Sequence, residues 1–502
     1  MRRLLLAAAA AAAFSLPALA QQSVLRIGMA QDADMLDPTL ARSYVGRIVF
    51  AGLCDKLVDI NEKLAIVPQL ATGFEWPDSK TLLLHLRAGV KFQDGTPMDA
   101  AAVKYSLDRH LTMEGSSRRG EISSIDHVEV VDPATVRVVL KAPNSPFLAQ
   151  LTDRAGMIVS PTAAKAEGKD FALHPVCAGP YKFTERVSQD HITLDRFPGY
   201  WNAGAIHIDR IIYRPIPDSS VALANLQAGA IDLDVQQVPS NVDAIRKDPR
   251  LKLAVYDGLG YQSITINVGN GPRAKTPIGE DARVRKAFEL SIDRKALIHV
   301  VYNDLFTPVA QSVPPSSPFY APSVQPPPRD IAKAKELLKE AGVKLPVTVD
   351  MMVINQPDQL QTAEVIQSMA SEAGFDVKIQ ATEFAASLDA SDRGDFSTYL
   401  IGWSGRADID ANLYSFVYTG APLNPTGYSN KQVDAWLNQA REVTDVAARQ
   451  AIYAKLAAKL EQDLPLIYLY SGKNIVAMST KVNGFVPVPD GIVRPQGMSI
   501  SK

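Results

Sequence analysis

Side chains that commonly carry catalysis or bind metal ions form no recognisable group in this sequence. The seven histidines form no H-E-x-x-H motif and no other pair at helical spacing that would hold a metal ion. Gly402, Trp403 and Ser404 begin like a nucleophile elbow, but Arg406 occupies the fifth position, where that motif needs glycine. There is no Walker loop, and no pair of acids is singled out for general acid–base work. We therefore predict no enzymatic activity, no catalytic residue, no cofactor and no metal site, with a site assembled from distant residues left open.

The two cysteines, Cys54 and Cys177, have no neighbouring histidines and would make a poor zinc site. An oxidising compartment would permit a disulfide between them. Two separate buried thiols fit the sequence equally well. Whether a disulfide forms depends on the distance between the two Cα atoms, which the sequence does not give.

The N-terminal segment has the pattern of a secretory signal peptide. Arg2 and Arg3 precede an apolar run over residues 4–14, and the segment ends on the small-residue pattern Ala18-Leu19-Ala20. The apolar run is short for a membrane span of roughly 20 residues. We therefore predict a signal peptide over residues 1–20 and a periplasmic product. No cysteine follows directly, so a lipid anchor is not expected.

The overall charge argues against a nucleic-acid partner. The chain has 52 Lys+Arg and 54 Asp+Glu, for a formal net charge of −2, whereas nucleic-acid binding calls for a basic surplus. Its 502 residues are enough for two or three domains with sizeable cores.

The elements that would position a binding site can be read from the spacing of apolar residues. Residues 261–268 alternate between apolar and polar, which indicates a half-buried strand, and a helix follows behind Asp281. Residues 347–354, 363–372, 376–380 and 399–402 then indicate strand, helix, strand and strand. That order is typical of an α/β unit with parallel pairing.

Eight short stretches resemble, in order, those of one family. They are LDP at 36–38, KFQDGTP at 91–97, GPY at 179–181, GYW at 199–201, DARVRKA at 281–287, AKELLKEAG at 334–342, AEVIQ at 363–367 and YSN at 428–430. Each stretch alone is a weak signal, but the ordered set covers nearly the whole predicted mature chain. On these residues the chain resembles the extracytoplasmic solute-binding proteins (family 5) of peptide, nickel and glutathione-type ABC importers.

The resemblance implies an α/β fold, a large type II periplasmic-binding-protein clamshell with an extra subdomain. Lobe I would be discontinuous, with an accessory subdomain beside it, and lobe II would follow. The implied ranges are 21–65, 178–270 and 470–502 for lobe I, 66–177 for the accessory subdomain and 271–469 for lobe II. The strands at 261–271 and 466–470 would cross between the lobes.

The resemblance also places Trp403 and Arg406 in a loop that faces the ligand. Dipeptide binders carry an acid at the position of Arg406, where it pairs with the ligand's ammonium group. A guanidinium there suits a carboxylate instead, so we expect a ligand with an anionic group held by Arg406 and stacked near Trp403. Asp408 and Asp410 would serve an amine or pair with Arg406. The alternative is that Arg406 is a surface or hinge residue in a salt bridge.

Further ligand-binding candidates follow from the same comparison. The carboxylate anchor of the dipeptide binders aligns with Val353 and Asn355, so that anchor is missing, and Asn355 remains as a cleft candidate. Tyr261 on the predicted crossing strand, and Met29 and Gln31 after the first strand, are expected to line the cleft. The backbone of Gly179 would offer an N–H to an anion.

Function in this family is capture by lobe closure followed by delivery to a permease. We therefore expect a peptide or peptide-like ligand, an ABC permease with its ATPase at the inner membrane as partners, and a monomer. The alternatives are a non-peptide solute, such as an organic or aromatic acid, an opine or a metal chelate, and a secreted hydrolase.

Overall fold

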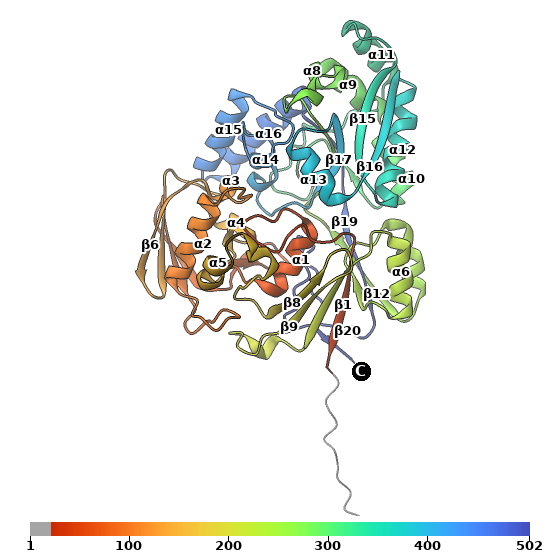
Figure 1. Cartoon of the computed structure of the whole chain (residues 1–502). Helices are drawn as coiled ribbons and strands as arrows, with labels where there is room; N and C mark the ends of the chain where they lie inside the picture. The colour runs from red at the N-terminus through yellow and green to blue at the C-terminus, as the bar shows by residue number, and fades with distance from the viewer. Residues whose placement is uncertain (1–21, 502) are drawn as a thin grey trace, which may run out of the picture.

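The computed structural model of this chain describes residues 22–501. Three larger β-sheets with helices packed around them form the molecule (Figure 1). Two of these sheets lie at the centres of two lobes, and the third forms an accessory subdomain, so the predicted two-lobe α/β fold is confirmed. The predicted signal peptide, residues 1–20, lies outside the described residues.

The first lobe is built on a seven-stranded sheet in the order β12-β19-β11-β1-β10-β9-β8. Its strands are β1 (Val24–Met29), β8 (Tyr181–Val187), β9 (His191–Arg196), β10 (Arg210–Pro215), β11 (Leu233–Asp234), β12 (Leu251–Asp257) and β19 (Lys473–Ser479). Strand β1 runs parallel to both β10 and β11. Helix α1 (Tyr44–Leu53) packs on this sheet, because Ile48 and Val49 share one core with Leu25 and Ile27. Helices α6 (Ser219–Ala228) and α7 (Val242–Lys247) pack against β12 and β19.

The second lobe is built on a six-stranded sheet in the order β14-β18-β13-β17-β15-β16. Its strands are β13 (Tyr261–Ile266), β14 (Thr307–Pro308), β15 (Val347–Ile354), β16 (Phe375–Thr382), β17 (Thr398–Trp403) and β18 (Leu466–Ser471). Its helices are α8 (Pro277–Glu280), α9 (Ala282–Ser291), α10 (Arg294–Tyr302), α11 (Ile331–Glu340), α12 (Pro357–Ser371), α13 (Phe384–Asp392), α14 (Asp410–Val417), α15 (Lys431–Glu442) and α16 (Val446–Asp463). Strand β15 pairs in parallel with both β16 and β17, as the strand–helix–strand order predicts.

The accessory subdomain contains a four-stranded antiparallel sheet in the order β4-β5-β7-β6. Its elements are β4 (Ala71–Asp78), β5 (Thr81–Leu86), β6 (Ile125–Asp132), β7 (Thr135–Leu140), α2 (Ala100–Thr112), α3 (Arg119–Ile122), α4 (Phe147–Gln150) and α5 (Pro161–Glu167). Its apolar core also takes in Leu57 and Val58. The subdomain therefore begins somewhat before the predicted boundary at residue 66. Two small hairpins, β2 (Val58–Ile60) with β3 (Ile66–Pro68) and β20 (Val482–Asn483) with β21 (Ser499–Ile500), complete the fold.

The connections between the lobes differ from the prediction. Strands β13 and β18 do not cross between lobes; they pair with each other inside the second lobe's sheet. The chain changes lobes just outside them, at residues 258–260 and at Gly472, and the Gly258 N–H donates to the Gly472 carbonyl across 3.3 Å. A Cβ on Gly260 would lie 2.2 Å from the Trp403 carbonyl oxygen, so only glycine fits this connector. The first change of lobe therefore comes before the predicted boundary at 270, because strand periodicity does not show which sheet a strand joins, whereas the second lies next to the predicted boundary at 470.

Cys54 and Cys177 are joined by a disulfide, and their Cα atoms lie 4.9 Å apart. Cys54 is the residue that ends α1, and Cys177 lies at the far end of the accessory subdomain, just before the chain returns to β8. The bridge therefore ties the two ends of the accessory subdomain to the first lobe. It decides the question that the sequence left open.

Candidate functional site: a cleft between the two lobes

A cavity of about 390 Å³ lies between the two lobes. Its first-lobe wall includes Gln31, Gln236, Gln237 and Asn474, and its second-lobe wall includes Tyr261, Gln262, Ile401, Trp403, Phe416 and Tyr470. The walls are thus mainly apolar and aromatic surface with interspersed side-chain amides, the composition of a small-molecule site. Of the residues proposed from the sequence, Gln31, Tyr261 and Trp403 line this cavity.

Trp403 and Tyr261 stand opposite each other where strands β17 and β13 pair. The Trp403 indole N–H donates to Asn412 Oδ1 across 3.0 Å, and its ring meets Phe416 edge-on at 4.7 Å. Tyr261 packs edge-on against Tyr468 at 4.9 Å, and burial raises the pKa of its hydroxyl well above the usual range. Both rings are therefore fixed before a ligand arrives, and the neutral tyrosine offers a hydroxyl and an apolar ring.

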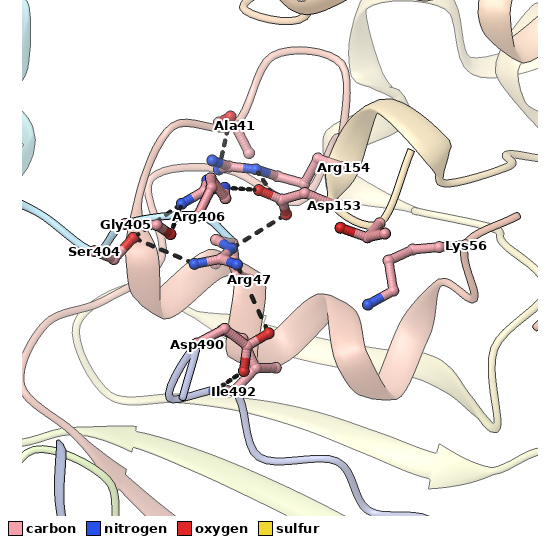
Figure 2. A network of polar contacts seen from close by, with 12 residues as sticks. Ala41, Arg47, Lys56, Asp153, Arg154, Ser404, Gly405, Arg406, Asp490 and Ile492 are labelled. Atoms are coloured by element: carbon pink, nitrogen blue, oxygen red, sulfur yellow. Dashed lines mark hydrogen bonds and ion pairs between the residues drawn. The ribbon is translucent and has the colours of Figure 1, made fainter. Parts of the chain in front are cut away.

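Arg406 lies outside the cavity wall, which contradicts the prediction that its guanidinium faces the ligand. Its Nε forms an ion pair with Asp153 Oδ2 from the first-lobe side (Figure 2). The guanidinium also stacks on the Trp403 ring at 4.4 Å. The Arg406 guanidinium also donates to the Gly405 carbonyl and Ser404 Oγ. The alternative stated from the sequence, a hinge residue in a salt bridge, describes this placement.

Asp153 is the centre of a buried network that joins the lobes. Arg47 Nε donates to Asp153 Oδ1 across 3.1 Å, and Arg47 Nη1 reaches Ser404 Oγ in the second lobe at 3.2 Å (Figure 2). Burial alone would raise the pKa of Asp153, but the positive charges of Arg406, Arg47, Arg154 and Arg118 hold that pKa well below its ordinary value. The carboxylate therefore stays ionised and binds guanidinium groups from both sides of the cleft.

Asp408 and Asp410 each have another arginine partner and do not pair with Arg406. Asp408 Oδ1 lies 2.9 Å from Arg449 Nη2, and Asp410 Oδ1 lies 2.8 Å from Arg441 Nε. Asp410 also accepts a hydrogen bond from Gln150 of the accessory subdomain at 2.9 Å. Neither aspartate lines the cavity, so the suggestion that they serve a ligand amine is not supported by their positions.

Three further candidates also lie elsewhere. Met29 is fully buried in the first-lobe core. The Gly179 N–H is already used, because it donates to the Leu53 carbonyl across 2.9 Å. Asn355 directly follows β15 and is exposed, and its N–H donates to the Thr382 carbonyl across 2.9 Å. None of the three lines the cavity, because the sequence does not show which way a side chain points or which carbonyl a backbone N–H meets.

The sequence reading missed the polar side chains at the start of α12. Gln356, Asp358 and Gln359 all line the cavity. Gln356 Nε2 donates to the Ala30 carbonyl of the first lobe across 3.0 Å, so this turn contacts both lobes. A proline at the first helical position followed by an acid is a helix-start signal, and it could have drawn attention to Pro357 and Asp358.

Within residues 22–501 there is no group of three or more His, Cys, Asp or Glu side chains placed to hold a metal ion. Over the same part of the chain, no helix combines the length and the apolar character needed to cross a membrane.

Comparison with known proteins gives the family. The family model for the middle part of bacterial extracellular solute-binding proteins, family 5, matches residues 65–424. The glutathione-binding protein GsiB of Pectobacterium atrosepticum is 31% identical over 486 residues, covering 94% of this chain and 92% of that protein.

Two solved structures share the whole fold. The periplasmic binding protein AgaA in complex with agropinic acid, from A. tumefaciens R10, is 27% identical with a TM-score of 0.87 and covers 95% of this chain and 99% of that one. The ABC transporter-associated periplasmic binding protein DppA of Helicobacter pylori, in complex with the peptide STSA, is 26% identical with a TM-score of 0.87 and covers 96% and 98%. This chain therefore belongs to the family 5 bacterial extracellular solute-binding proteins.

Proposed function

We propose that this protein is the substrate-binding component of an ABC importer and captures a peptide or peptide-like small solute by closing its lobes around it. The observation that carries the proposal is the cavity between the lobes, whose walls come from both of them. A ligand shifts the population toward the closed form only by contacts that both lobes make together. The loaded protein then delivers its ligand to a membrane permease driven by an ATPase.

We expect the protein to bind its ligand without chemical turnover. The proposed location is the periplasm, to which the protein is exported with cleavage of the signal peptide after residue 20. The protein acts as a monomer. Intact mass and N-terminal sequencing of the exported protein test the cleavage site, and light scattering tests the oligomeric state. A chemically altered ligand recovered after incubation would refute the non-enzymatic role and favour a secreted hydrolase.

A thermal-shift screen of the purified mature protein tests the ligand class. Its panel contains free dipeptides and tripeptides, glutathione, opines, aromatic and organic acids, and a nickel–histidine chelate. A ligand present at about 100 times its Kd stabilises the native state by about 2.7 kcal/mol. Calorimetry then measures affinity for each hit, and a panel in which no peptide or peptide-like compound binds while another class does would overturn the peptide proposal.

An opine or related non-peptide solute is the second candidate. The binding loop departs from the dipeptide pattern, because Arg406 replaces the acid expected there and is tied to Asp153. The similar structure with agropinic acid bound shows that a protein of this fold accepts such a solute. Hits confined to opines in the same screen would favour this candidate.

A further inference from the structure

A smaller cavity of about 100 Å³ adjoins the main one where the two lobes meet. The residues that line both cavities are Gln236, Val238, Gln356, Asp358 and Gln359. The first lobe contributes Ala30 and Asp234 to this side cavity, and the second lobe contributes the first turn of α12. It thus has one carboxylate from each lobe.

Asp234 is buried at the end of β11, with 2% of its surface exposed. It pairs in register with Gly28 on β1, where a Cβ would lie only 2.9 Å from Asp234 Oδ1. The side-chain amide of Gln237 donates to Asp234 Oδ2. Burial raises the pKa of Asp234 to about 7, because the hydrogen bonds that it accepts only partly offset the loss of water.

Asp358 approaches the same cavity from the second lobe. It is the second residue of α12, and Gln359 Nε2 donates to its Oδ2 across 3.0 Å. Gln359 is held in turn by Gln262 Nε2, which donates to Gln359 Oε1 across 2.8 Å. Burial raises the pKa of Asp358, and no positive charge contributes to lowering it. Asp358 is therefore held in place by uncharged side chains, and no positive charge balances its carboxylate.

The positive charges around the cleft are already used elsewhere. Arg42 and Lys473 line the main cavity, but Arg42 pairs with Asp392 and Lys473 Nζ lies 2.6 Å from Asp257 Oδ1. Within residues 22–501, neither Asp234 nor Asp358 forms an ion pair.

A third acceptor at the same place has no partner. Gln236 Oε1 is buried without a hydrogen-bond donor in the part of the chain that the structure describes, and Gln236 lines both cavities. Buried acceptors normally have a donor, so an unfilled one beside two uncompensated carboxylates points to a missing ligand group rich in N–H donors.

Both carboxylates lie where the lobes meet, and both are removed from water there without a counter-charge, which is unfavourable. An ammonium group has three N–H donors and one positive charge, and it would satisfy acceptors from both lobes at once. We propose that the side cavity holds the ammonium group of the ligand, between Asp234 of the first lobe and Asp358 of the second. The ligand is then an amine-bearing solute, and the inference rests on the proposed capture by lobe closure.

Methylammonium chloride is the probe, because it carries the proposed group alone. Unfolding temperatures are compared at about pH 8, above the pKa of about 7 that burial gives Asp234, against sodium chloride and tetramethylammonium chloride at equal ionic strength. We expect methylammonium to stabilise the wild-type protein more than either control salt. Asp234→Asn and Asp358→Asn should lose this difference, while Asp243→Asn, which removes an exposed charge on α7, should keep it. Equal stabilisation by sodium, or a methylammonium effect that survives both cavity variants, overturns the ammonium site.

The screen hits provide a second readout. For a hit with a free amino group, N-acetylation or the Asp358→Asn variant should weaken binding by about tenfold to a hundredfold, the range for a charge-assisted hydrogen bond. Hits that bind equally well after both changes overturn the ammonium site and leave capture by closure intact. If methylammonium stabilises the protein specifically but no peptide or peptide-like compound binds, the ammonium site is supported and the proposed ligand class is wrong.

Discussion

Replacing Asp153 with asparagine removes a negative charge that Arg47, Arg154 and Arg406 share at the junction of the lobes, and leaves Arg47 its weaker contact with Asp490. Arg47 Nε lies 3.1 Å from Asp153 Oδ1, and at an effective dielectric constant of about 20 that attraction amounts to about 5 kcal/mol. Breaking a buried pair by removing one partner costs about 3–5 kcal/mol, because the remaining charges stay buried. We therefore expect Asp153→Asn to lower the free energy of unfolding by about 3–5 kcal/mol.

For a domain of roughly 150–250 residues, a loss of that much unfolding free energy lowers the melting temperature by about 6–20 °C. Differential scanning calorimetry at neutral pH measures it, because the pKa of Asp153 is held well below its ordinary value and the group is ionised there. Asp126→Asn is the matched control, since Asp126 is an exposed acid on β6 of the accessory subdomain. Melting of Asp153→Asn at the same temperature as this control would refute the reasoning.

The Arg406→Gln variant separates the contribution of the second lobe from that of the first. The variant keeps the contacts of Asp153 with Arg47 and Arg154 and removes only the positive charge of Arg406, which lies in the loop after β17. We expect a smaller loss of stability and a shift toward the open form, read as a larger radius of gyration. Affinity for a confirmed ligand should fall only by the factor by which the closed form loses population, because Arg406 lies outside the cavity.

Three further predictions concern other parts of the structure. Removing the Cys54–Cys177 disulfide should lower the free energy of unfolding by about 2–5 kcal/mol, measured by urea denaturation with and without reductant, and equal midpoints would contradict it. Burial raises the pKa of both Asp55 and Asp234 to about 7, above the unfolded value, so the folded protein holds protons that the unfolded chain has lost between about pH 4 and pH 7. Each carboxyl should therefore lower stability as pH rises through that window, by up to about 1.4 kcal/mol per pH unit, while buried His110, whose pKa is lowered to about 4, acts in the opposite direction; a urea series in which Asp55→Asn and Asp234→Asn leave the pH dependence unchanged would count against it. Trp403→Phe should abolish most of the ligand-induced change in tryptophan fluorescence, because Trp403 lines the cavity; a full change in the variant would exclude that ring from the site.

Local patterns in the sequence were sufficient for most elements of the fold. Asp330 stands directly before an amphipathic run, which is a helix-start signal, and its side chain accepts a hydrogen bond from the Lys333 N–H at the start of α11. Gly342 follows α11 with a φ of 68°, the left-handed conformation that glycine adopts readily. Capping and periodicity depend on neighbours a few residues apart, and therefore they can be read from one sequence.

The pairing of elements was harder to predict. Strand β13 forms where a half-buried strand was predicted, but all of its residues are buried. It belongs to the second lobe, because its partners β17 and β18 arrive much later in the chain. The same limit explains Arg406, whose partner Asp153 lies in the first-lobe half of the sequence. A guanidinium that suits a carboxylate was correctly read from the residue type, but which carboxylate it meets depends on the folded arrangement.

The binding residues show the same division. Tyr261, Gln31 and Trp403 reach the cavity because each follows from a strand end that the sequence located. Asp234 and Asp358 were missed because they lie far apart in the chain, and only the meeting of the two lobes makes them a pair. Burial and proximity across the cleft, rather than residue type, distinguish them from other aspartates in the chain.

Small-angle scattering of the mature protein, with and without a ligand confirmed by calorimetry, tests the central claim most directly. Capture between two lobes predicts a smaller radius of gyration in the loaded protein, with the largest distances in the molecule shortened. Superimposable curves for a ligand that binds with full stoichiometry would contradict closure around a solute.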